Sequence, residues 1–123
     1  MNNLNSVLLE GNLVKVPELS RTSSGTPVCR LTIATNRYYK INDDYQQEVS
    51  FFEITTWNKL AQTCSEYLTK GRGIRVIGRL KQERWKSADG KSHSRIIVAD
   101  DHIEFRPQYN RSEDNKKELE VSS

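Results

Sequence analysis

The amino-acid sequence predicts an all-β domain, a small Greek-key barrel of five strands with one α-helix between the third and the fourth. Five runs rich in β-branched and aromatic residues are separated by turn residues, and the one stretch with helical spacing falls between the third and fourth runs. The 123 residues, of which 35% are hydrophobic and 28% charged, suit one domain with a modest core. A small barrel fits such a polar chain better than a large layered α/β fold.

The first two strands are predicted from apolar, β-prone runs. Residues 4–14 form the first run, and an interruption at Gly11-Asn12 favours a bend or bulge within it. Residues 16–19 should leave this strand. After a turn rich in Ser and Gly, residues 28–39 form the second strand, whose inward face holds Cys29, Leu31 and Ile33.

The third strand should follow as part of a meander. Asn42-Asp43-Asp44 is typical of a turn, and residues 49–57 are again aromatic and β-branched. Both alternating faces of this run carry aromatic and polar residues, so the period alone does not separate core from surface. Phe52 and Ile54 are the better candidates for the core or for an interface.

A helix is predicted next, because the apolar period changes from two to about four. The residues at this spacing are Leu60, Ala61, Cys64, Tyr67 and Leu68. Asn58 is the predicted N-cap, Lys70 should lie near the helix end, and Gly71 should occupy the C′ position, where glycine accepts a left-handed backbone.

The last two strands, residues 73–86 and 92–105, should pair across a turn at Asp89-Gly90. The expected inward residues of the fifth strand are Ile97, Ala99, Ile103 and Phe105. Five strands with a helix after the third is the order of an oligonucleotide/oligosaccharide-binding (OB) fold. The domain should span residues 1–107, and the polar residues 108–123 are predicted to form a flexible, disordered tail.

Positive charge is concentrated in residues 70–95. This segment holds nine Lys or Arg against two acids, a net charge of +7, whereas the whole chain carries only +3. Alternation places Trp85 on the same face as Arg75, Arg79 and Lys81. An aromatic ring on a cationic strand suits single-stranded nucleic acid, because cations follow the phosphates while the ring stacks on a base of any identity.

Other functional classes find little support. Cys29 and Cys64 form no CxxC pair and are predicted to be buried free thiols, and His93 and His102 are too scattered to suggest a catalytic pair. We therefore expect no enzyme, metal or cofactor. No apolar run is long enough for a spanning helix, and no secretory signal is recognisable at residues 1–6, which favours a cytoplasmic, nucleoid-associated protein.

Several blocks, in order from about Asn5 to Phe105, resemble the bacterial single-stranded DNA-binding protein family. They are Asn5-Ser-Val-Leu-Leu-Glu-Gly-Asn-Leu, Pro17-Glu-Leu, Ser24-Gly-Thr-Pro-Val, Ile33-Ala-Thr-Asn-Arg, Trp57-Asn-Lys-Leu-Ala, Glu66-Tyr-Leu-Thr-Lys-Gly, Gly78-Arg-Leu, and Trp85 with Asp89-Gly90. The resemblance implies an OB fold, a homotetramer, and a protein without enzymatic activity that coats single-stranded DNA in replication, recombination and repair.

The resemblance also implies stacking positions. Trp85 matches the family's fourth-strand aromatic, and Trp57 stands where the family often has Phe. Phe51 and Tyr39 stand at positions often filled by Trp, and Tyr38 beside the latter is a further candidate. Cations near these rings are the expected phosphate contacts: Arg37, Lys70, Arg72, Arg75, Arg79, Lys81, Arg84 and Lys86.

The tail departs from the family pattern. Family members typically end in an acidic tip that recruits replication and repair proteins, whereas residues 108–123 interleave acids with Lys and Arg and carry a net charge of −1. The chain is thus either a specialised member or a shortened form, and partner recruitment through the tail is in doubt. Two rival functions stay open: an RNA-binding OB fold, and a protein-interaction subunit of a replication complex.

Overall fold

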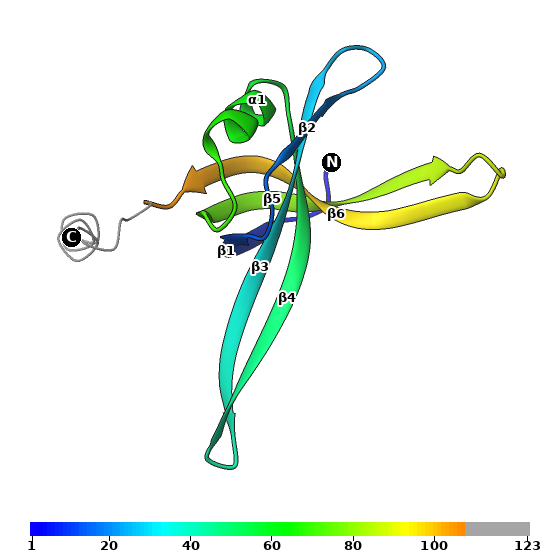
Figure 1. Cartoon of the computed structure of the whole chain (residues 1–123). Helices are drawn as coiled ribbons and strands as arrows, with labels where there is room; N and C mark the ends of the chain where they lie inside the picture. The colour runs from blue at the N-terminus through cyan, green and yellow to red at the C-terminus, as the bar shows by residue number, and fades with distance from the viewer. Residues whose placement is uncertain (108–123) are drawn as a thin grey trace.

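The computed structural model describes residues 1–107, so the predicted disorder of residues 108–123 lies outside the described part. A closed barrel carries two long hairpin arms that project in different directions, and one helix lies at an end of the barrel (Figure 1). The elements are β1 (Val7–Leu13), β2 (Glu18–Arg21), β3 (Pro27–Ile41), β4 (Asp44–Trp57), α1 (Asn58–Tyr67), β5 (Gly73–Lys86) and β6 (Ser92–Phe105).

The strands form one sheet in the order β1-β5-β6-β4-β3-β2, which an additional β1–β3 pairing closes into a barrel. Among the strand pairings of residues 1–107, only β4–β6 is parallel. The closure takes place at Asn12, where β1 passes from β5 to β3. Gly11 permits this crossing, because a Cβ at that position would overlap the carbonyl oxygen of Ala34.

The barrel interior is filled by aliphatic side chains from alternate strand positions. Leu31, Ile33, Ile54, Ile74 and Val76 are all fully buried there. Helix α1 covers this core with Ala61 and Cys64. Cys29 and Cys64 are buried free thiols, as predicted, and burial raises their pKa values to about 11 and about 12, so both remain protonated at neutral pH.

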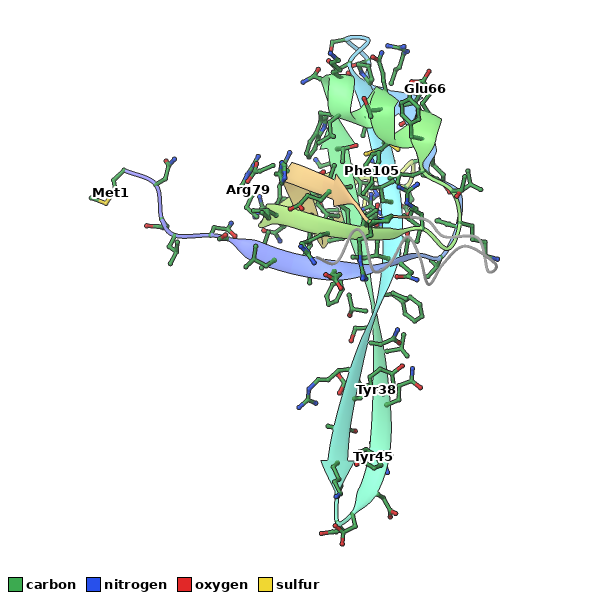
Figure 2. All side chains as sticks on the ribbon, turned by 90° about the vertical axis from the view of Figure 1, so that its left-hand side faces the viewer. Met1, Tyr38, Tyr45, Glu66, Arg79 and Phe105 are labelled. Carbon is green, nitrogen blue, oxygen red and sulfur yellow. The ribbon has the colours of Figure 1, made fainter. Side chains whose placement is uncertain are left out.

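The two arms are continuations of barrel strands. The β3–β4 arm ends in a two-residue turn in which Asn42 and Asp43 have φ values of 47° and 70°, the conformation of a type I′ hairpin. The β5–β6 arm ends in residues 87–91, with Gly90 at φ 83°. Figure 2 shows Tyr38 and Tyr45 on the β3–β4 arm, well away from Arg79 and Phe105 on the barrel.

The predicted order of five strands with one helix before the fourth is confirmed, and the differences lie at the edges. Residues 16–19 were expected to leave the first strand and no strand was predicted after them, yet Glu18–Arg21 form the edge strand β2, whose side chains are all exposed and therefore give no apolar pattern. Strand β4 begins at Asp44, not at residue 49, because its ladder with β3 continues through polar residues to the turn.

The predicted ends of the helix were wrong. Asn58 is not the N-cap: it is the first helical residue, has φ 61°, and follows Trp57 at the cap, which makes no side-chain hydrogen bond. Helix α1 ends at Tyr67, so Gly71 is not its C′ residue. Gly71 has φ 90° in a separate turn, closed by a hydrogen bond from the Arg72 N–H to the Thr69 carbonyl.

Two of the four residues predicted to face inward from the last strand lie on the other side of the sheet. A bulge in β6 leaves Asp101 without a cross-strand residue opposite it in β5, because Gly78 pairs with Asp100 while Ile77 pairs with His102. Val98 therefore shares the interior with Ile103 and Phe105. Ile97 and Ala99, expected inside, are buried on the opposite side of the sheet.

Candidate nucleic-acid interface

The side of β4, β6 and β5 that faces away from the barrel interior is the candidate interface, and we call it the outer face. In β4 the alternation that buries Ile54 places Phe51, Glu53, Thr55 and Trp57 on this side. Ala99 of β6 pairs with both Thr55 of β4 and Arg79 of β5. The outer face therefore extends from β4 across β6 to β5, which are the third, fifth and fourth of the predicted strands.

Trp57 and Lys81 meet on the outer face. The Lys81 Nζ lies 5.0 Å from the centroid of the Trp57 ring, within the range of a cation–π contact. Ile97, the cross-strand neighbour of Lys81, is buried on the same face of the sheet. The indole and the ammonium group are therefore presented together on one face of the sheet.

Trp85 lies farther out on the β5–β6 arm and is 46% exposed. The Arg95 guanidinium carbon is 5.6 Å from the centroid of its ring. Arg95 is in turn held by two acids, with its Nε 3.0 Å from Glu83 Oε1 and its Nη1 3.1 Å from Glu53 Oε2. Because Glu53 belongs to β4, this network connects the indole of the arm to the barrel wall.

A groove of about 420 Å³ accompanies this network. It is lined by Arg30, Glu83, Arg84, Trp85 and Arg95. Arg30 belongs to β3 and lies 3.6 Å from Glu53, measured from its Nε to Oε1. Three strands therefore contribute charged groups to one hollow beside an exposed indole.

The remaining predicted aromatics do not all share this face. Phe51 is 64% exposed on the outer face. Tyr39 pairs with Gln46, so it belongs to the opposite alternation, whereas Tyr38 follows that of Phe51. The Tyr39 ring packs under Arg37, whose guanidinium carbon lies 4.8 Å from the centroid.

The residues predicted to contact phosphate fall into those that form ion pairs and those that do not. Arg37, Arg75 and Arg79 form ion pairs with Glu48, Glu10 and Asp101 respectively. The hydrogen bonds to Glu10 raise the pKa of Arg75 above its usual value. Among residues 1–107, the three predicted lysines have no acidic partner within ion-pair distance: Lys70, Lys81 and Lys86.

Position along the chain separates the cations further. Arg72 and Lys70 precede β5, at the end away from Trp85, and the Arg72 Nε donates to the Arg106 carbonyl at 2.6 Å. Arg84 and Lys86 alternate with Trp85 along the strand, yet both line hollows beside its ring. The structure therefore brings together Phe51, Trp57, Arg79, Lys81, Arg84, Trp85 and Lys86, although Arg79 is paired with Asp101, and it leaves Arg37, Tyr39, Lys70, Arg72 and Arg75 outside this group.

Sequence reasoning missed several participants in this surface, among them Arg30, Glu53, His93 and Arg95. Arg30 and Glu53 lie on strands whose alternation was visible, but their meeting with Arg95 depends on the parallel β4–β6 pairing. His93 is the cross-strand partner of Trp85, and a register counted outward from the Asp89-Gly90 turn would have found it.

Residues 1–107 contain neither a cluster suited to a metal ion nor a helix that could span a membrane. No group of three or more His, Cys, Asp or Glu residues within 1–107 is arranged to hold a metal ion. No helix in the same range has both the length and the hydropathy needed to cross a bilayer.

Residues 4–106 match the profile of the single-strand binding protein family. The single-stranded DNA-binding protein of Treponema pallidum is 38% identical, over 85% of this chain and 59% of its own length. That of Thermotoga maritima is 37% identical, over 98% of this chain and 88% of its own length. The chain thus spans less than two thirds of the Treponema relative, but most of the Thermotoga one.

Two solved structures share the fold. A Plasmodium falciparum SSB complex with ssDNA superposes with a TM-score of 0.75 at 19% identity, over 87% of this chain and 98% of the other. A deletion mutant of the single-stranded DNA binding protein from Thermus aquaticus gives a TM-score of 0.74 at 24% identity, over 85% of this chain and 51% of the other. The predicted OB fold is thereby confirmed.

Proposed function

The chain belongs to the single-strand binding protein family, and we propose that it binds single-stranded DNA with little dependence on base sequence. The observation that carries this proposal is the exposed Trp85 indole on a cationic arm, held to the barrel through Arg95 and Glu53. An indole that is already oriented can stack on any base without a further ordering cost.

The proposed path of the strand crosses the outer face. Bases would stack on Trp85, Trp57 and Phe51, while Lys81, Lys86 and Arg84 contact phosphates. Tyr39 and the paired Arg37, Arg75 and Arg79 would contribute less, since the first faces the other way and the arginines must exchange an acidic partner for a phosphate. Lys70 and Arg72 would meet DNA only if it continues around the barrel.

The wider biological role is also part of the proposal. Residues 1–107 form the DNA-binding domain and residues 108–123 a tail whose mixed charge does not favour recruitment of replication and repair proteins. We place the protein on single strands at the nucleoid, in the cytoplasm, acting in replication, recombination and repair by binding and not by catalysis. We further propose a homotetramer, which light scattering at micromolar concentration tests and a monomeric mass would exclude.

Fluorescence anisotropy with three labelled oligonucleotides of one base sequence tests the ligand: single-stranded DNA, single-stranded RNA and duplex DNA. We expect the single-stranded DNA to bind most tightly, with an affinity that falls as salt rises because phosphate contacts release counterions. Preference for RNA would identify an RNA-binding protein. No binding to any of the three at low salt would instead favour a protein-interaction subunit.

A further inference from the structure

Trp85 does not stand alone on the arm. Its cross-strand partner His93 lies with its ring centroid 5.5 Å from that of the indole, at an interplanar angle of 20°. This is an offset-stacked pair, and both side chains are exposed. The two rings together present a wider aromatic surface than the indole alone.

The hairpin turn holds the His93 ring in place. The Ser87 hydroxyl lies 3.1 Å from His93 Nε2 and also bonds to Asp89 Oδ1. Hydrogen bonds from Ser87 and from the Lys91 N–H lower the pKa of Asp89, so its carboxylate is ionised and can only accept. The Ser87 hydroxyl therefore donates to Asp89 and accepts from His93, whose Nε2 carries the proton.

A groove of about 520 Å³ runs along this ring pair. Its lining consists of Trp85 and His93, the cations Arg84 and Lys86, and the hydroxyl-bearing Ser92 and Ser94. The volume falls within the range of pockets that hold small organic ligands. Aromatic planes flanked by two cations and two hydroxyls suit a nucleotide, which has a flat base and an anionic phosphate.

We propose that His93 is a nucleobase-stacking residue, which extends the Trp85 platform along the β5–β6 arm and is positioned by Ser87. The proposal rests on the single-stranded DNA binding proposed above and assigns a further contact within it. A base that extends beyond the edge of the indole would stack on the imidazole, and its phosphate would lie toward Arg84 and Lys86.

Three variants of the full chain test the proposal in titrations with oligo-dT. His93→Ala should weaken binding about fivefold, the lower part of the range for one stacked base, whereas His93→Phe should stay within about twofold of the parent because it keeps a ring. His102→Ala is the control, since His102 is an exposed histidine on the same strand at the barrel end. Equal affinity of His93→Ala and the parent overturns the proposal, as does equal weakening by Ala and Phe.

A double-mutant cycle separates base contact by His93 from mere support of the indole. In a Trp85→Ala background at low salt, His93→Ala should still weaken binding. No further loss there means that His93 acts only through Trp85, which contradicts the proposal.

The outcome for the parent protein keeps the two proposals distinct. If the parent fails to bind oligo-dT at low salt, the proposed function fails and His93 has no base to contact. If the parent binds and Trp85→Ala weakens it while His93→Ala does not, only the assignment of His93 fails.

Discussion

The two arms of the molecule are built alike and secured differently. Each is an antiparallel hairpin that continues two barrel strands, β3–β4 in one and β5–β6 in the other. On the β3–β4 arm the ion pairs are local, joining Arg37 to Glu48 and Lys40 to Asp43. On the β5–β6 arm Arg95 reaches across to Glu53 of the barrel wall while it covers one side of Trp85.

This difference between the arms determines which of them can contribute more to the affinity for DNA. An aromatic ring whose position is fixed relative to the barrel loses little freedom when a base stacks on it, whereas a ring on an arm with only local contacts must be ordered on binding. We therefore expect the β5–β6 arm to dominate the affinity and the β3–β4 arm to add to it.

The base of the β5–β6 arm should be most sensitive to a single methyl group. A Cβ at Gly78 would overlap the Ala99 carbonyl oxygen across the ladder, so Gly78→Ala should lower the free energy of unfolding by about 3 kcal/mol. Urea denaturation measures this. Gly73→Ala is the matched control, because its Cβ would meet mainly the flexible Arg106 side chain. If Gly73→Ala lowers the free energy of unfolding as much as Gly78→Ala does, the close approach of Gly78 to the Ala99 carbonyl is not the cause of the loss.

Asp100, opposite Gly78 at the same base, should make stability depend on pH. Burial raises the pKa of Asp100 to about 6, and a backbone interaction with His102 offsets only part of this rise. The folded state therefore holds a proton that the unfolded state has lost between about pH 4 and 6, so stability falls as pH rises through this window.

The size of this effect should be roughly 2 to 3 kcal/mol between pH 4 and pH 7.5, as expected for such a difference in pKa. Asp100→Asn should flatten the profile measured by urea unfolding at several pH values. A variant with the same slope as the parent would mean that another group controls it.

A comparison of one aromatic on each arm tests the contrast in binding. Trp85→Ala should cost roughly 1 to 3 kcal/mol of single-stranded DNA affinity, whereas Tyr39→Ala, on the opposite alternation of the other arm, should cost less than about 0.5 kcal/mol. Anisotropy titrations at one salt concentration measure both. A larger effect of Tyr39→Ala would contradict the expectation that the β5–β6 arm dominates the affinity.

The smallest expected effect distinguishes an unpaired cation from a paired one. Lys81→Ala should reduce the slope of log affinity against log salt by about 0.7, the value for one phosphate contact on a single strand. Arg79→Ala should change the slope less, because Arg79 is paired with Asp101. A larger change for Arg79 would place the phosphates nearer to it than to Lys81.

Periodicity predicted the elements that bury apolar side chains, and it failed where burial does not decide the structure. Cys29, Leu31 and Ile33 alternate in the sequence as they do in the barrel. Strand β2 is fully exposed, and α1 ends at Tyr67 with the Leu68 N–H bonded to the Cys64 carbonyl, before the glycine that was expected to mark its end, so neither feature follows from an apolar period.

The candidate site was predictable only in part for a related reason. Charge density and alternation singled out Trp85 and Lys81, which the structure places on one face. The network of Arg30, Glu53 and Arg95 depends on a parallel pairing between strands far apart in sequence, which no local pattern encodes. The bulge at Asp101 likewise exchanged the two faces of β6, and the only glycine beside it, Gly78, lies on the partner strand β5 and not in β6 itself.

The most direct test of the account is the fluorescence of Trp85 alone. Trp57→Phe leaves Trp85 as the single tryptophan of the chain, and this variant would be titrated with oligo-dT and, as a control, with duplex DNA. We expect strong quenching by the single strand, weakened by salt, and little change with the duplex, because a base stacks on the indole. Binding of the single strand without any change in Trp85 fluorescence would contradict the claim that this arm receives the bases.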